Sequence, residues 1–303
     1  IFNPDGTSQI DLPVFEPNFG GGVRTAVGDV TGDGVADLIV GTGPGRVAEV
    51  RVYDGVSHSL ARTYTPFADF TGGTFVSAGD FNNDGFTDVV ITPDQGGGPR
   101  VSIYSGKDNA VLANFFGIDD PNFRGGARSA VGDVNGDGKI DLVVAAGFGG
   151  GPRVAVFDGA SLGGTPAHLF GDFFVFEQAL RNGVYVTAGD LNGDGCADLI
   201  FGGGPGGGPR VYALSGSEMV HGNPAGAQLA NFFAGNIENR GGVRVAAKDL
   251  DNDAHADLVV GDGTGAGSRV TAYLGKNIAL NGTPPAEDAF DAYPGFNGGV
   301  FVG

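Results

Sequence analysis

Short runs of apolar, mostly β-branched residues alternate with turns rich in glycine and aspartate along the whole chain. The first group of such runs reads "GGVRTAVGD" from Gly21, "ADLIVG" from Ala36, "EVRVYDG" from Glu49 and "ARTYTPF" from Ala61. Each run has the length and the residue types of a β-strand, and the apolar positions show no helical period. Four successive strands joined by glycine turns predict an antiparallel sheet in which each strand pairs with the next.

This pattern recurs five times, marked by the acidic segment "GDVTGDGVADLIVG" and its later copies. The copies begin at residues 28, 79, 132, 189 and 248, so successive starts lie 51, 53, 57 and 59 residues apart. Self-similarity at such a period indicates a repeat architecture. A four-stranded sheet becomes stable when neighbouring sheets cover its two apolar faces, so we expect an all-β fold, a β-propeller of four-stranded antiparallel blades. A linear β-solenoid, whose repeats are usually shorter, is the alternative.

We expect a single propeller domain over residues 1–303, with five complete blades and a partial sixth. The complete blades are expected at approximately 22–68, 73–118, 125–176, 182–235 and 241–294. Residues 1–17 match the third and fourth strands of a repeat, and residues 297–303 match a first strand, so both termini outline a sixth blade without its acidic turn. Either the chain is a window from a longer repeat array, or a neighbouring copy adds the missing strand to the open edge.

Composition narrows the class of protein. Glycine accounts for 59 of 303 residues, yet 41% of the chain is hydrophobic, which excludes a disordered linker and collagen. A net charge of -18, with 17 basic against 35 acidic residues, excludes an electrostatic nucleic-acid binder. The lone Cys196 excludes a disulfide framework. No apolar run is long enough for a membrane span, and no signal peptide is present, so any export signal is expected outside this chain.

The acidic turns have the spacing D-x-[DNT]-x-D-x-x-x-D. In the first turn Asp29, Thr31, Asp33 and Asp37 offer side-chain oxygens, and a tight bend at Gly34 presents the carbonyl of Val35. Hard oxygen donors at positions 1, 3, 5, 7 and 9 suit Ca²⁺, whereas Mg²⁺ needs stricter geometry and zinc prefers His and Cys. An EF-hand loop ends in Glu at position 12 between helices; here that position is valine and strands flank the turn. Ordinary Asp-Gly hairpin turns explain one such pair, but not three spaced acids repeated five times.

These turns, the "DLIVG" strand that follows the first of them, and the "GGGPRV" segments containing Gly96, Gly150 and Gly207 resemble FG-GAP or VCBS-like repeats. The resemblance covers essentially the whole chain. Such repeats build β-propellers like the head of integrin α-subunits and are abundant in large bacterial surface proteins. The resemblance implies a calcium-binding, non-enzymatic module at the cell surface or in the extracellular space, acting in adhesion or assembly. It implies a protein or glycan partner at a propeller face, or self-association through the incomplete sixth blade.

Carried over turn by turn, the resemblance implies about five Ca²⁺ ions, with position 7 offering only its backbone carbonyl. The implied ligands are Asp29, Thr31, Asp33, Val35 and Asp37; Asp80, Asn82, Asp84, Phe86 and Asp88; Asp133, Asn135, Asp137, Lys139 and Asp141; Asp190, Asn192, Asp194, Cys196 and Asp198; and Asp249, Asp251, Asp253, His255 and Asp257. Thr31 replaces the usual Asp or Asn, and its single hydroxyl can act through a water. The fifth turn departs most, because Ala254 takes the place of a glycine and disfavours a left-handed backbone.

A second pattern lies five residues before the first Asp of each turn, where arginine and aromatic residues alternate. The residues are Arg24, Phe75, Arg128, Tyr185, Arg244 and, next in register, Phe301. In propellers of the resembled type the first strand lines the central axis, so these side chains are expected to ring the channel, and the alternation favours six blades over seven. Arg-aromatic stacking between blades is one interpretation. An anion or carbohydrate site at the channel mouth is the other.

No catalytic or organic-cofactor site is expected. The four histidines lie in different segments, and no Gly-x-Ser-x-Gly elbow is present. The segment "GGGPGGGPR" from Gly202 lacks the Gly-Lys-Ser/Thr of a phosphate-binding loop. Arginines at matching places, Arg100, Arg153, Arg210 and Arg269, are expected to cover sheet faces or pair with the acidic turns, with ligand binding as the alternative. The alternative function is a carbohydrate-active enzyme, a polysaccharide lyase or hydrolase.

Overall fold

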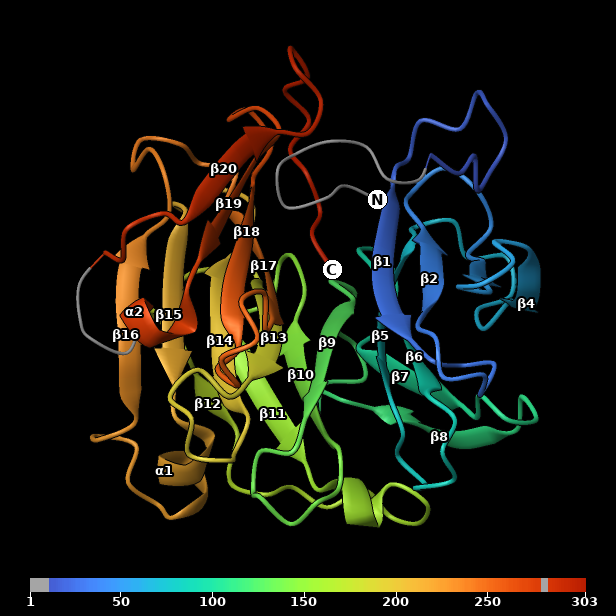
Figure 1. The fold of residues 1–303 in the computed structure, drawn as a ribbon, viewed down its shortest axis with the longest axis horizontal. Coiled ribbons are helices and arrows are strands. Elements are labelled where there is room, and N and C mark those ends of the chain that lie inside the picture. The colour runs from blue at the N-terminus through green and yellow to red at the C-terminus, as the bar shows by residue number, and fades with distance from the viewer. Residues whose placement is uncertain (1–10, 279–282) are drawn as a thin grey trace. The chain divides into compact units, whose positions relative to one another are not determined.

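The computed structural model describes residues 11–278 and 283–303 as five four-stranded antiparallel sheets (Figure 1). In every sheet each strand pairs with the next strand of the chain, which is the topology of a propeller blade. The predicted all-β class and the four-stranded antiparallel blades are therefore confirmed, with five blades found.

The strands fall where the repeats place them. The first blade holds β1 (Val23–Gly28), β2 (Asp37–Thr42), β3 (Val50–Tyr53) and β4 (Leu60–Tyr64); the second β5 (Thr74–Gly79), β6 (Asp88–Pro93), β7 (Arg100–Tyr104) and β8 (Val111–Phe116); the third β9 (Ala127–Gly132), β10 (Asp141–Ala146), β11 (Arg153–Phe157) and β12 (Phe173–Phe174); the fourth β13 (Val184–Gly189), β14 (Asp198–Gly203), β15 (Arg210–Leu214) and β16 (Gln228–Phe233); the fifth β17 (Val243–Lys248), β18 (Asp257–Asp262), β19 (Arg269–Tyr273) and β20 (Asp288–Asp291).

The blades belong to two compact units. The unit we call the three-blade unit consists mainly of Asn18–Asp133 and Asp137–Gly183, and in it β1 contacts β5 and β5 contacts β9. The two-blade unit consists mainly of Val184–Val302, and in it β13 contacts β17. First strands of successive blades therefore lie side by side within each unit.

The second strand of each blade is the most apolar because neighbours cover both of its faces. Every residue of β6, β10 and β14 is buried, whereas the outer strands β4 and β8 are partly exposed. Burial on both faces explains why these strands read as continuous apolar runs rather than as alternating ones.

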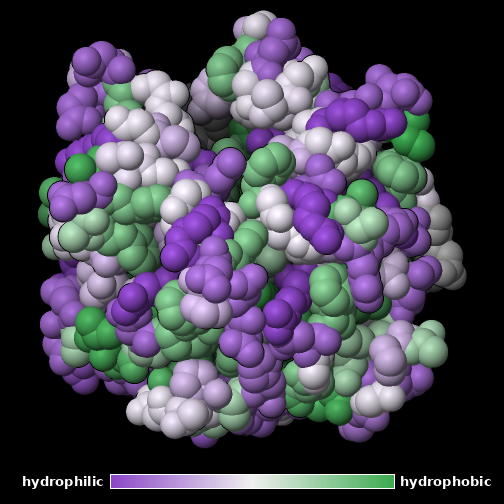
Figure 2. All heavy atoms as spheres, turned by 180° about the vertical axis from the view of Figure 1, so that it is seen from behind, coloured by the Kyte–Doolittle hydropathy of each residue, from purple (hydrophilic) through white to green (hydrophobic). Residues whose placement is uncertain are grey.

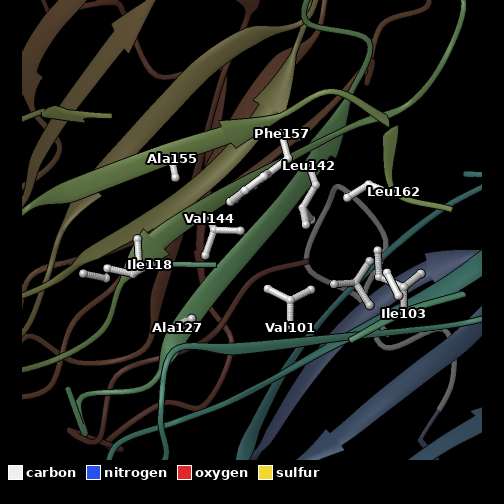
Figure 3. Packing of buried hydrophobic residues seen from close by; sticks show 12 residues of the cluster. Val101, Ile103, Ile118, Ala127, Leu142, Val144, Ala155, Phe157 and Leu162 are labelled. Atoms are coloured by element: carbon white, nitrogen blue, oxygen red, sulfur yellow. The ribbon is translucent and has the colours of Figure 1, made fainter. Parts of the chain in front are cut away.

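Blades pack through apolar clusters between sheets. In the cluster of Figure 3, Val101 and Ile103 from β7 lie with Leu142 and Val144 from β10 and with Phe157 from β11. All five side chains are at most 3% exposed. The second and third blades therefore share one core, which fixes their packing within the three-blade unit.

In the described part of the chain, three short helical segments lie in the linkers between third and fourth strands, where the sequence predicted none. They are η1 (Gly159–Ser161), α1 (Gly216–Val220) and α2 (Gly275–Ile278). Ser215 caps α1 by accepting a bond from the backbone N–H of Glu218. Segments of three to five residues are too short to display a helical period, so the pattern could not reveal them.

The expected sixth blade stays a prediction. Residues 11–17 and 297–303 contain no strand, and residues 1–10 lie outside the described part of the chain. Within the two-blade unit, the N–H of Gly265 donates to the carbonyl of Asn297 (2.8 Å), as the N–H of Gly206 donates to that of Arg240 (2.7 Å). The C-terminal segment thus meets the fifth blade as the start of a further blade would.

Hydrophobic and hydrophilic residues are interspersed on the face drawn in Figure 2. Among the described residues, no helix has the length and apolar character required to cross a membrane.

Candidate metal centres

Each acidic turn is organised by the carboxylate at its first position. Asp29 accepts backbone bonds from Gly32 (2.7 Å), Asp33 (3.1 Å) and Gly34 (2.8 Å). The first acids of the second to fifth turns, Asp80, Asp133, Asp190 and Asp249, accept equivalent bonds. The carboxylate at position 5 accepts in turn from the N–H of position 7, at 2.9 Å for Asp33 and Val35. Hydrogen bonds from the turn's own backbone N–H groups therefore hold its carboxylates close together.

Two positions of every turn have left-handed backbones. Position 4 is Gly32, Asn83, Gly136, Gly193 or Asn252, and position 6 is Gly34, Gly85, Gly138, Gly195 or Ala254, all with φ between 55° and 86°. Glycine and asparagine tolerate this region, whereas alanine does not. Ala254, with φ 70°, therefore adopts the conformation that the sequence identified as unfavourable for it.

The carboxylate at position 9 has a different environment from the others. Asp37, Asp88, Asp141, Asp198 and Asp257 are all fully buried. In the second turn, one oxygen of Asp88 accepts from the N–H of Phe81 (2.9 Å) and the other from the N–H of Gly106 (3.1 Å). The same carboxylate thus joins the turn to the connection between the third and fourth strands.

The glycine that meets this carboxylate was missed by the sequence analysis. In every blade it lies 18 residues after position 9, and these residues are Gly55, Gly106, Gly159, Gly216 and Gly275. A Cβ on any of them would lie 1.8–2.2 Å from the carbonyl oxygen of the residue before the buried aspartate. Only glycine permits that approach, and the constant spacing of 18 was the signal that could have identified it.

Burial raises the pKa of two of these carboxyl groups. The pKa of Asp88 rises to about 6 and that of Asp198 to about 7, mainly through desolvation. Nearby turn carboxylates, Asp80 and Asp84 in one case and Asp194 in the other, add to the rise, while backbone donors oppose it. Both turns therefore hold negative charge that their own donors do not fully compensate.

The fifth turn brings three carboxylates together most closely. Oxygens of Asp249, Asp251 and Asp257, from positions 1, 3 and 9, lie within 4.8 Å of one another. Lys276, the residue after Gly275, donates from Nζ to Asp251 (2.5 Å) and lies 3.2 Å from Asp253. Bonds to these two carboxylates raise the pKa of Lys276 above its usual value. The fifth turn, which departs most from the sequence pattern, thus has closely spaced carboxylates and a lysine, Lys276, bound to two of its acids.

Side chains at position 7, expected to contribute only a carbonyl, connect successive turns. A Cβ on Gly32 of the first turn would lie 2.2 Å from the ring of Phe86, so this ring covers that glycine. In the two-blade unit the ring of His255 covers Gly193 in the same way. The next residue adds a backbone bond, from Thr87 to the carbonyl of Asp29 (2.8 Å). Neighbouring turns are therefore packed against each other within each unit.

The alternating arginines and aromatics stack within each unit. The guanidinium carbons of Arg24 and Arg128 lie 5.0 and 5.5 Å from the ring centre of Phe75. That of Arg244 lies 5.2 Å from the ring of Tyr185 and 4.8 Å from that of Phe301. These distances are those of cation–π contacts, and all three arginines are buried. A ring of these residues around a channel stays a prediction.

The arginines that begin the third strands contact side chains of their own blade, away from its acidic turn. Three of them contact the fourth strand: Arg100 with Asn114 (2.5 Å), Arg210 with Asn231 (3.0 Å) and Arg269 with Asp291 (3.9 Å). Arg153 contacts Asp172 (2.8 Å), the residue just before the fourth strand of its blade. The reason is topological, because the third strand begins at the end of the sheet opposite the acidic turn.

Replacing Asp88 by alanine in excess chelator should lower the free energy of unfolding by about 2–4 kcal/mol, because the part-buried N–H of Phe81 and the buried N–H of Gly106 lose their acceptor. Asp84→Ala, which removes a half-buried carboxylate of the same turn, should change it by less than about 1 kcal/mol. Urea unfolding of both variants measures the difference. Equal effects would show that position 9 is not the structural carboxylate.

Replacing Ala254 by glycine should raise the free energy of unfolding by about 1 kcal/mol, because it removes the strain of a left-handed alanine. Ala256→Gly, two residues further on at a position without positive φ, should lower it. Thermal unfolding of the pair checks the prediction, and a gain from both variants would contradict it.

Comparison with known proteins gives a consistent picture. The model of the FG-GAP-like repeat matches residues 29–91, 80–144 and 133–201, which together exceed half of the chain. Integrin alpha-5 of Xenopus laevis is 29% identical over 217 residues, covering 62% of this chain and 19% of that protein. Integrin alpha-V of Gallus gallus is 28% identical over 204 residues, covering 60% and 20%. The chain thus spans about a fifth of the length of these relatives.

Solved structures show the same fold at low identity. A rhamnogalacturonan lyase of Bacillus licheniformis has a TM-score of 0.50 at 13% identity, covering 84% of this chain and 49% of the other. A protein of unknown function from Bacteroides caccae has a TM-score of 0.50 at 8% identity, covering 84% and 73%. With three tandem repeat matches and blades of matching topology, the chain belongs to the FG-GAP-like repeat family and has the all-β propeller fold of four-stranded blades.

Proposed function

We propose that this chain is a calcium-binding, non-enzymatic propeller module that acts in adhesion or assembly at the cell surface or in the extracellular space. The observation that carries the proposal is the repetition of one oxygen-rich turn in all five blades, with its acids held by the same backbone bonds. A turn that served only to reverse the chain would not need to concentrate 16 of the 35 acidic residues.

The donor set of the turns fits calcium. Each turn offers oxygens alone: carboxylates at positions 1, 5 and 9, a hydroxyl, amide or carboxylate at position 3, and a carbonyl at position 7. Calcium takes such oxygens in a flexible geometry, whereas zinc favours nitrogen and sulfur. The close approach of Asp249, Asp251 and Asp257 is repulsive; Lys276 offsets part of this repulsion, and a divalent cation would offset more of it.

The ions would act on stability rather than on chemistry. An ion that binds only the folded chain stabilises it by mass action. Five divalent ions would add +10 to the net charge of -18 and leave -8, which reduces the repulsion within each turn. The residues proposed to hold them are the five ligand sets given above.

Family membership supports the adhesion or assembly role, since the relatives found by sequence are integrin α-subunits. The lyase of similar structure shares the fold alone, so it gives no residue of this chain a catalytic role. We therefore propose a protein or glycan partner at a propeller face and no reaction.

Calcium should raise the melting temperature of the chain, and excess chelator should reverse the effect. At a free concentration 100 times the dissociation constant, each occupied site adds about 2.7 kcal/mol to the free energy of unfolding. Calorimetry with and without calcium measures the shift, and elemental analysis of the dialysed protein counts the ions. An unchanged melting temperature in chelator would refute the calcium proposal.

Lys276 is expected to compete with calcium for the fifth turn, because its ammonium already lies between two of the proposed ligands. Lys276→Met should increase the calcium affinity of one site by about tenfold, the equivalent of one charge-assisted hydrogen bond. Lys107→Met is the matched control: Lys107 holds the same place after Gly106, but its Nζ lies over the ring of Phe86, 5.5 Å from the centre. Calcium titration calorimetry of both variants distinguishes them, and equal affinities would contradict the competition.

A further inference from the structure

Three blades share a surface group that neither the fold nor the acidic turns explain. In each, the arginine that begins the third strand is paired in register with a phenylalanine of the fourth: Arg100 with Phe116, Arg153 with Phe174, and Arg210 with Phe233. Residues directly opposite each other in an antiparallel pair project from the same face of the sheet. The phenylalanines are 48%, 44% and 40% exposed, although burying a side chain of this size would stabilise the fold.

A second arginine completes each group from the linker to the next blade. Nη1 of Arg124 donates to the carbonyls of Pro121 (2.7 Å) and Phe123 (2.8 Å). Arg181 binds the carbonyls of Gln178 and Leu180 in the same way, and Arg240 those of Ile237 and Asn239. Within the described part of the chain, no other hydrogen bond to these three guanidinium groups is found. Each guanidinium group is therefore held through Nη1, and each of the three arginines is exposed.

A glycine keeps the space between ring and guanidinium open. A Cβ on Gly98 would lie 3.5 Å from the ring of Phe116 and 3.9 Å from Nη1 of Arg124. The corresponding distances are 3.1 and 3.8 Å at Gly151, and 3.3 and 3.8 Å at Gly208. We call each group a notch, and its members are Gly98, Arg100, Phe116 and Arg124; Gly151, Arg153, Phe174 and Arg181; and Gly208, Arg210, Phe233 and Arg240.

The blade fold does not require the notch. In the first blade Glu49 takes the place of the strand arginine, Thr65 that of the phenylalanine and Thr71 that of the linker arginine. In the fifth blade the corresponding residues are Arg269, Asp291 and Asn297. Both of these blades nevertheless form the same four-stranded sheet. The notches also hold six of the 17 basic residues of a chain whose net charge is -18. An exposed ring beside two arginines, repeated in three blades of an acidic protein even though Arg153 also pairs with Asp172, indicates recognition of an anion that carries an apolar surface.

We infer that the notches bind an acidic polysaccharide, with the phenylalanine packing on the C–H surface of a uronic acid and the paired arginines binding its carboxylate. A polymer of one acidic sugar presents the same group repeatedly, which suits three copies of one site on a single chain. Nucleic acids fit less well, because their charge lies on the phosphate backbone, whereas a uronic acid carries its carboxylate on the same ring that offers the apolar C–H surface. This ligand would be the partner of the proposed adhesion module, and to that extent the inference rests on the proposed function.

The notches and the acidic turns lie at opposite ends of each blade. The acidic turn joins the first and second strands, whereas the notch is built on the loop joining the second and third. Binding at the notch can therefore be lost without altering the calcium-dependent stability, and the two proposals can fail separately.

The test is binding of oligogalacturonate, alginate oligomers and hyaluronate to the immobilised chain, with dextran as the neutral control. We expect at least one polyuronate to bind and dextran not to bind. The triple variant Arg124→Gln, Arg181→Gln and Arg240→Gln, which keeps amide donors for the loop carbonyls, should weaken that binding by about tenfold for each site engaged. Gly98→Leu, which fills one notch without a positive φ, should weaken it as well. Arg269→Gln, in the fifth blade, is the matched control and should have no effect.

Circular dichroism and the calcium-induced shift in melting temperature should be the same in all these variants. The inference is overturned if no polyuronate binds, or if the triple variant binds as tightly as the parent chain. Tighter binding of poly-L-glutamate or of a single-stranded oligonucleotide than of every polyuronate would overturn the ligand class. Polyuronate binding that persists while chelator leaves the melting temperature unchanged would refute the calcium proposal alone.

Discussion

The buried carboxylate at position 9 is the interaction on which each blade depends. It lies at the start of the second strand, accepts backbone bonds from the acidic turn before it, and accepts another from a glycine 18 residues later. Removing a charge from water is unfavourable unless donors surround it, and here the donors come from two separate segments. One side chain therefore fixes three parts of the blade, and the glycine follows from it because no Cβ fits at that approach.

Contacts between successive acidic turns connect one blade to the next. The buried aspartate fixes the conformation of its acidic turn, and the turn of the next blade packs against it. In the two-blade unit the N–H of Ala256 donates to the carbonyl of Asp190 (2.7 Å), and His255 covers Gly193. A cation in one turn would thus stabilise a surface on which the neighbouring turn packs, so calcium is expected to act on the unit rather than on isolated loops.

The sequence predicted what depends on local pattern. Strands, turn positions and the left-handed residue at position 6 followed from apolar runs and from glycine placement, and the structure contains them. It did not separate Asp88 from Asp84, because burial depends on which strands cover a residue and both are aspartates in one turn. Gly106 was missed because two strands separate it in the sequence from its partner, Asp88. For Arg100 and Arg153 the sequence left two structural roles open, covering a sheet face or pairing with an acidic turn, because pairing with the neighbouring strand depends on register, which sequence spacing does not reveal.

The five copies within one chain separate what the fold needs from what it permits. The carboxylate at position 9, the glycine 18 residues later and the left-handed residue at position 6 recur in every blade, even where alanine must adopt a strained backbone. The arginine-phenylalanine notch recurs in three blades and is replaced by Glu49 and Thr65 or by Arg269 and Asp291 in the others. A feature that the sheet can lose without changing its topology is not retained for the sheet. The end of the blade opposite the acidic turn is therefore where the blades of this chain differ without a change in topology, which is why the proposed recognition site is placed there.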